Sequence, residues 1–127
     1  CTVLSSDVKV RIAASDLSTY PDLSAVCGPV VRDDLDKNAI TNPALLVEVT
    51  SPSSKDYDRG EKLSHYKQLP ALKAVVIVAH DAQRITVVER KAETWAITEY
   101  RAGEVALVDE LGLRINVNQL YAVLAAL

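Results

Sequence analysis

Two largely apolar runs, separated by a polar segment, most strongly constrain how this chain can fold. "PALLVEV" and "KAVVIVA" occupy residues 43–49 and 73–79, and each is typical of a strand that is covered on both faces. Between them, "SPSSKDYDRGEKLSHYKQL" predicts a loop entering a helix, with Ser54 or Asp56 as its N-cap and Pro70 as its end. A strand, a helix and a second apolar strand indicate a parallel crossover. We therefore expect two parallel strands at the centre of a sheet.

The segments around this unit alternate apolar and polar residues, as half-buried strands do. The expected strands outside the central pair lie at 7–12, 20–28, 84–91 and 94–103, the last two forming a hairpin. Residues 104–117 predict further strand or turn structure. "NQLYAVLAAL" then ends the chain as a helix, capped by Asn116 or Asn118. The pattern predicts α/β or α+β architecture with one mixed sheet.

Composition excludes several protein classes. The chain has 127 residues, 49% apolar and 24% charged, which is typical of one soluble globular domain. Because no run approaches the length of a membrane span, we expect no membrane partner. The net charge of -3 argues against a surface that binds nucleic acid throughout, but it leaves room for a local basic face.

The two cysteines and the first residue lead to two further expectations. Cys1 and Cys27 show neither a disulfide framework nor zinc-ligand spacing, so we expect free thiols in a reducing cytoplasm. The chain opens at Cys1 rather than at methionine, so we also expect that residues are missing before it.

Glu48 is a carboxylate within the first apolar run, and burying a charge without a partner is costly. Alternation along the strand places Glu48 and Thr50 on one face. Val47 and Val49 lie on the opposite, apolar face, which we expect to pack into the core. Asp22 lies in the earlier strand at 20–28. If the two strands are neighbours, Asp22 and Glu48 can share a Mg²⁺ or Mn²⁺ ion, with the backbone carbonyl of Val49 as a third ligand.

Lys62 lies on the helix that follows this strand. Asp58, Lys62 and Tyr66 are spaced i, i+4, i+8 and form one stripe. A lysine there can reach over the strand ends and hold an attacking water or a phosphate charge. Spacing alone favours a simpler interpretation, a surface ion pair between Asp58 and Lys62. Tyr66 is predicted to be a core residue, together with Leu63 and Leu69.

"YPD" at residues 20–22 and "LLVEVTSPSSKDYDRGEKLSHY" at residues 45–66 resemble the PD-(D/E)XK nuclease superfamily. More narrowly, they resemble a bacterial branch assigned to restriction endonucleases. The resemblance covers about Asp7 to Arg90, and "LGLRINVNQLY" is similar to the usual C-terminal ending of that branch. It implies a restriction-endonuclease-like α/β fold, a mixed β-sheet flanked by helices. It also implies a single nuclease domain over residues 1–127 that lacks its N-terminal helical part.

The resemblance also implies a site. Asp22 and Glu48 match the metal ligands, and Mg²⁺ or Mn²⁺ is the implied cofactor. The standard motif places a lysine two residues after the second acid, where this chain has Thr50, which supplies no positive charge. Lys62 matches the position to which the lysine has moved in this branch. The implied protein is a metal-dependent hydrolase of DNA phosphodiester bonds, cytoplasmic, and a homodimer like related nucleases.

Two alternatives remain open from the sequence. The acidic net charge and Thr50 at the standard lysine position favour a catalytically inactive module that binds nucleic acid or another protein with the same fold. A phosphoesterase acting on a small nucleotide is the third hypothesis. The sequence does not distinguish DNA from RNA as substrate.

Overall fold

The structure is a computed structural model that describes residues 1–52 and 60–126. The expected helix caps, Ser54 and Asp56, lie outside these residues, as does Asp58 of the predicted stripe. The helices are α2 (Glu61–Tyr66) and α3 (Val117–Ala125), with short 3-10 turns η1 (Ala13–Ser15) and η2 (Asp109–Leu111). The strands are β1 (Thr2–Leu4), β2 (Lys9–Ile12), β3 (Leu17–Thr19), β4 (Leu23–Val26), β5 (Ala39–Ile40), β6 (Leu45–Val49), β7 (Ala74–Val78), β8 (Arg84–Lys91), β9 (Thr94–Arg101), β10 (Val105–Val108) and β11 (Leu113–Asn116).

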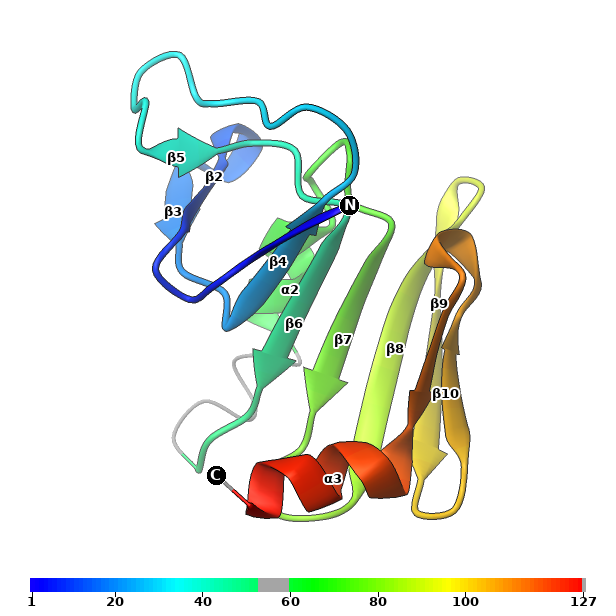
Figure 1. The fold of residues 1–127 in the computed structure, drawn as a ribbon. Coiled ribbons are helices and arrows are strands. Elements are labelled where there is room, and N and C mark those ends of the chain that lie inside the picture. The colour runs from blue at the N-terminus through cyan, green and yellow to red at the C-terminus, as the bar shows by residue number, and fades with distance from the viewer. Residues whose placement is uncertain (53–59, 127) are drawn as a thin grey trace.

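A six-stranded mixed sheet, ordered β1-β4-β6-β7-β8-β9, forms the centre of the fold (Figure 1). The predicted parallel pair is β6 and β7, and it occupies the middle of the sheet. All other neighbouring pairs in this sheet are antiparallel, including the predicted β8–β9 hairpin. Every residue of β7 is buried, which explains why its sequence is apolar without alternation. The predicted mixed α/β sheet is therefore confirmed.

Each face of the sheet has its own cover. Helix α2 lies against one face, and the β10–β11 hairpin with α3 covers the other (Figure 1). On the α2 face, Leu63, Tyr66 and Leu69 are at most 5% exposed, as their spacing predicts. They share a cluster with strand residues such as Leu46 and Val88. This packing fixes α2 over the strands that carry the candidate carboxylates.

The opposite face confirms the predicted C-terminal helix. Val117 is fully buried at the start of α3 and packs with residues of β7, β8 and β10. The Asn116 side chain accepts a hydrogen bond from the backbone N–H of Gln119, so Asn116 is the N-cap of α3. Neither described helix combines the length and apolar character that crossing a membrane requires.

A second, three-stranded sheet, ordered β3-β2-β5, was not predicted. The strand expected at 7–12 is β2, which lies in this small sheet rather than in the main one. Its partners, β3 and β5, are three and two residues long, too short to show alternation in sequence. Val10 and Ile12 of β2 nevertheless join the core on the α2 face.

Cys1 and Cys27 form a disulfide, so the expectation of free thiols was wrong. Strand β1, which was not predicted, pairs with β4 in the register that sets Thr2 opposite Val26. This register brings the Cα atoms of the two cysteines to 4.1 Å. The thiol-based argument for a reducing cytoplasm therefore loses its premise.

Candidate active site

The two predicted metal-ligand carboxylates lie on neighbouring strands. The antiparallel register of β4 and β6 pairs Leu23 with Val47, so its continuation sets Asp22 opposite Glu48. The Oδ2 atom of Asp22 accepts a hydrogen bond of 2.7 Å from the backbone N–H of Val49. Asp22 is exposed, whereas Glu48 is only 4% exposed and lies beneath α2. The structure thus brings both side chains to one end of the sheet.

Lys62 and Tyr66 reach the same carboxylate from α2. Lys62 Nζ lies 3.2 Å from Glu48 Oε1, and the Tyr66 hydroxyl donates to that oxygen at 2.5 Å. The two residues are one helical turn apart, with Lys62 Nζ 6.0 Å from the centre of the Tyr66 ring. Leu63, between them in sequence, is buried and holds the helix on the sheet. The sequence-predicted Asp22, Glu48 and Lys62 are therefore brought together.

The electrostatics of Glu48 reflect competing effects. Burial raises the pKa of this carboxyl group above its usual value, and this is the largest effect. The Tyr66 hydrogen bond and the Lys62 charge lower the pKa, while the negative charge of Asp22 raises it further. The pKa stays raised although a lysine is in contact. A cation between the two carboxylates would therefore favour the ionised form of Glu48.

Val49 differs from its prediction. Its side chain is 40% exposed because β6 ends there, so it does not pack in the core as expected. Its backbone N–H points toward Asp22. The N–H and C=O of one strand residue point to the same side of the strand, so the Val49 carbonyl also opens toward Asp22. This orientation suits the predicted role of that carbonyl as a ligand.

Thr50, at the standard lysine position, has a structural partner. Its Oγ1 lies 2.7 Å from His80 Nδ1 and accepts a hydrogen bond of 3.0 Å from the His80 backbone N–H. Its own backbone N–H donates to the carbonyl of Val78. Thr50 thus ties the end of β6 to the segment after β7. Lys62 supplies the positive charge beside Glu48.

The donor set fits a hard divalent cation. Among the residues that the structure describes, no three His, Cys, Asp or Glu side chains gather in a way that could hold a metal ion. Asp22, Glu48 and the Val49 carbonyl offer two carboxylates and a carbonyl, which are oxygen ligands suited to Mg²⁺. Mg²⁺ commonly binds through one or two carboxylates and takes its other ligands from water and substrate phosphate. On that pattern, Asp22, Glu48 and the Val49 carbonyl would be the ligands that the protein supplies.

Sequence reasoning missed the contact between Tyr66 and Glu48. It placed Tyr66 in the core, which is correct, since Tyr66 is 1% exposed. The hydroxyl of a buried tyrosine needs a polar partner, and Glu48 was the buried acid without one. The sequence could have predicted the contact, because Tyr66 and Glu48 were both expected to be buried and both needed a polar partner.

Comparisons by sequence relate this chain to a family model and to two proteins of one organism. A family model described as "Putative restriction endonuclease", the Uma2 family, matches residues 1–120. The "Uncharacterized protein slr1290" of Synechocystis sp. is 34% identical over 126 residues, covering 98% of this chain and 65% of that protein. The "Uncharacterized protein sll1609" of the same organism is 28% identical over 95 residues, covering 74% of this chain and 54% of that protein. The chain thus spans less than two thirds of either relative.

A solved structure has the same fold as this chain. It is described as "a putative nuclease belonging to DUF820 from Anabaena variabilis", and it superposes with a TM-score of 0.68. The superposition covers 94% of this chain and 67% of that chain at 17% sequence identity, which shows a shared fold. The family match over residues 1–120 identifies the protein as a member of the Uma2 family, whose description is "Putative restriction endonuclease".

Proposed function

We propose that this protein is a metal-dependent endonuclease that hydrolyses phosphodiester bonds in DNA. The observation that carries the proposal is the convergence of Lys62 and Tyr66 on the buried Glu48, with Asp22 at the same end of the sheet. Membership of a family described as "Putative restriction endonuclease" supports it. A buried acid with a raised pKa beside a lysine is also more typical of functional sites than of surface ion pairs.

Each residue has a proposed role. Asp22, Glu48 and the carbonyl of Val49 would hold Mg²⁺ or Mn²⁺. When bound, such an ion polarises a phosphate and lowers the pKa of a coordinated water. Lys62, which is 19% exposed, is close enough to Glu48 to hold a phosphate oxygen or the attacking water at the same place. Tyr66 is a positioning residue, because its hydroxyl fixes the orientation of the Glu48 carboxylate.

Plasmid DNA and single-stranded DNA, incubated with the full chain and either Mg²⁺ or Mn²⁺, test the proposal. We expect cleavage that Glu48→Ala and Asp22→Asn abolish and that Lys62→Met reduces by about 100-fold or more. Glu93→Gln, an exposed acid between β8 and β9, is the matched control and should cleave like the parent. No cleavage with any metal, with Glu48→Ala indistinguishable from the parent, would refute the nuclease assignment.

A second candidate is a catalytically inactive module with the same fold, binding nucleic acid or a protein. Thr50 favours it, because the standard lysine position is committed to a hydrogen bond with His80. Calorimetric titration with Mn²⁺ separates the two candidates. Binding that Asp22→Asn and Glu48→Gln abolish favours the nuclease, and an absence of such binding favours the module. Gel filtration with light scattering would test the homodimer that we still propose from the family resemblance.

A further inference from the structure

Arg84, at the start of β8, is a largely buried arginine whose charge is poorly compensated. Its side chain is 18% exposed, and its Nε atom is buried without a hydrogen-bond partner. Among the residues that the structure describes, its ion pair is with Asp81, where Arg84 Nη2 and Asp81 Oδ1 are 3.9 Å apart. That separation is too long for a hydrogen bond. Because buried polar atoms are nearly always paired, Arg84 points to an anionic ligand.

The backbone of Arg84 is held firmly. Its carbonyl accepts a hydrogen bond of 3.0 Å from the backbone N–H of Ala79, and the Tyr121 hydroxyl of α3 lies 2.9 Å from the same carbonyl. The backbone N–H of Arg84 donates to the carbonyl of Ala82 at 2.9 Å. A side chain on a backbone that is already fixed loses less conformational freedom when it binds a ligand.

A second arginine lies directly across the hairpin, because Arg84 pairs with Arg101 in the register of β8 and β9. Directly paired side chains share one face of a sheet, and like charges in such a pair are destabilising. The Arg101 side chain is 64% exposed, and its Nη2 lies 3.2 Å from Glu99 Oε2. A guanidinium has five N–H donors, more than this one contact uses. An anion bound between Arg84 and Arg101 would offset their mutual repulsion.

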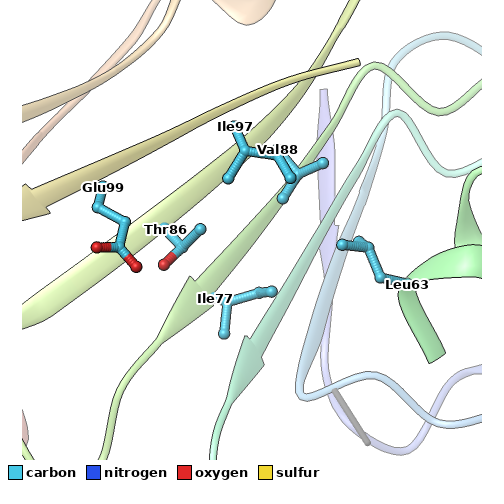
Figure 2. A pocket seen from close by; sticks show the side chains of 6 residues that line it. All are labelled: Leu63, Ile77, Thr86, Val88, Ile97 and Glu99. Atoms are coloured by element: carbon cyan, nitrogen blue, oxygen red, sulfur yellow. The ribbon is translucent and has the colours of Figure 1, made fainter. Parts of the chain in front are cut away.

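Strand register places this arginine pair near the candidate active site. Successive direct pairings across β6, β7, β8 and β9 join Glu48 to Thr86 and then to Glu99. Thr86 and Glu99 lie next to each other on the face that α2 covers (Figure 2). Arg84 and Arg101 are two residues away on the same strands, so they point to the same face. Two strand spacings and two residues separate Arg84 from Glu48, which is about 12 Å.

We infer that Arg84 and Arg101 form a subsite for a backbone phosphate of the DNA substrate, apart from the bond that is cleaved. The inference rests on the proposed nuclease function. A planar guanidinium matches two phosphate oxygens with parallel hydrogen bonds, so arginine suits this ligand. At about 12 Å from Glu48, the phosphate bound here is not the one beside the proposed metal ligands. Contacts to such phosphates fix the position of DNA on a protein. The net charge of -3 leaves this attraction to local basic groups.

Fluorescence anisotropy of the full chain with a short, labelled DNA duplex tests the subsite. The titrations contain EDTA, so that no cleavage occurs, and are repeated at several salt concentrations between about 50 and 200 mM. We expect Arg84→Gln to weaken binding by about tenfold and to reduce the dependence of log K on log salt by about one. The loss should be equal for two duplexes of unrelated sequence, because a phosphate contact carries no sequence information.

Three further variants make this experiment decisive. Arg101→Gln changes an exposed side chain, so it should leave the fold intact and also reduce the salt dependence by about one. Arg84→Lys keeps the charge but not the planar guanidinium, so it should keep the salt dependence of the parent and lose part of the affinity. Arg114→Gln removes an exposed arginine from β11, in the hairpin on the opposite face, and should bind like the parent.

Affinity and salt dependence equal to those of the parent, in folded Arg84→Gln or in Arg101→Gln, would overturn the inference. A parent that binds no duplex would also overturn it. Thermal unfolding with inorganic phosphate tests the other source of the same ligand. A rise in Tm that Arg84→Gln abolishes, with the DNA affinity of that variant unchanged, would assign the site to free phosphate and overturn the DNA subsite.

Cleavage of plasmid DNA with Mg²⁺ reports separately on the proposed function. Cleavage by the parent, together with an unchanged salt dependence in Arg84→Gln, would overturn the subsite and leave the nuclease assignment intact. A reduced salt dependence in Arg84→Gln without any cleavage by the parent would support the phosphate subsite and refute the nuclease assignment.

Discussion

Replacing Tyr66 by phenylalanine tests the link between the buried acid and the fold most directly. The change removes one hydroxyl and keeps the ring, which is 1% exposed. Glu48 is 4% exposed, so water cannot easily replace the lost donor. A hydrogen bond to a charged group contributes about 1.5–3 kcal/mol. We therefore expect Tyr66→Phe to lower the free energy of unfolding by about 2 kcal/mol where Glu48 is ionised.

The loss should depend on pH with a defined sign. In the folded protein the pKa of Glu48 is raised by burial, and the Tyr66 hydroxyl lowers it. Removing the hydroxyl raises the folded-state pKa further, away from the unfolded value. A carboxyl group whose pKa is raised on folding destabilises the protein as pH rises through that pKa. The difference in the free energy of unfolding between the parent and Tyr66→Phe should therefore be smallest below the pKa of a glutamate in the unfolded chain. This difference should grow as the pH rises through the pKa of Glu48 in the folded protein.

Urea unfolding measures the free energy of unfolding of the parent and the variant at several pH values between about 4 and 8. The fluorescence of the single tryptophan, Trp95, follows the unfolding. Tyr121→Phe is the matched control, because the Tyr121 hydroxyl donates to the neutral carbonyls of Ala79 and Arg84 at 2.7 and 2.9 Å. Tyr121→Phe should lower the free energy of unfolding by about 1 kcal/mol at every pH. If the two variants show equal losses at all pH values, Glu48 is not an ionised acceptor of the Tyr66 hydrogen bond, and the reasoning fails.

Three further changes have expected outcomes in thermal or urea unfolding. Cys27→Ser removes the disulfide to Cys1, which closes a loop with a sequence separation of 26, and should lower the free energy of unfolding by about 3 kcal/mol. A reductant should destabilise the parent but not this variant. Thr50→Val loses two hydrogen bonds with His80 and should cost about 1–3 kcal/mol; an unchanged stability would mean that this tie is dispensable. Asn116→Ala should cost about 1 kcal/mol and Asn116→Asp almost nothing, so equal effects would argue against the cap.

Local pattern determined the centre of this fold. The largely apolar residues 45–49 and the wholly apolar residues 74–78 favoured central strands, and the helix between them made the pair parallel. The alternation within the first strand placed Glu48 and Thr50 on one face, but only the packing showed that α2 covers this face. The spacing of Leu63 and Tyr66 fixed which side of α2 meets the sheet. These properties depend on neighbours within about one turn or one strand, so the sequence alone contains them.

The tertiary structure decided which residues of different helices and strands come into contact. The disulfide needed the register of β1 against β4, which has too few residues to leave a periodic signal. The Tyr66 hydrogen bond to Glu48 needed the helix seated at one height on the strand. Across the main sheet, Glu48 pairs with Ile77 and Thr86 pairs with Glu99, and these pairings needed the registers between successive strands. Local sequence periodicity states which face of an element is buried, but only packing sets the register between elements, and a shift of one residue would turn each strand's side chains to the other face.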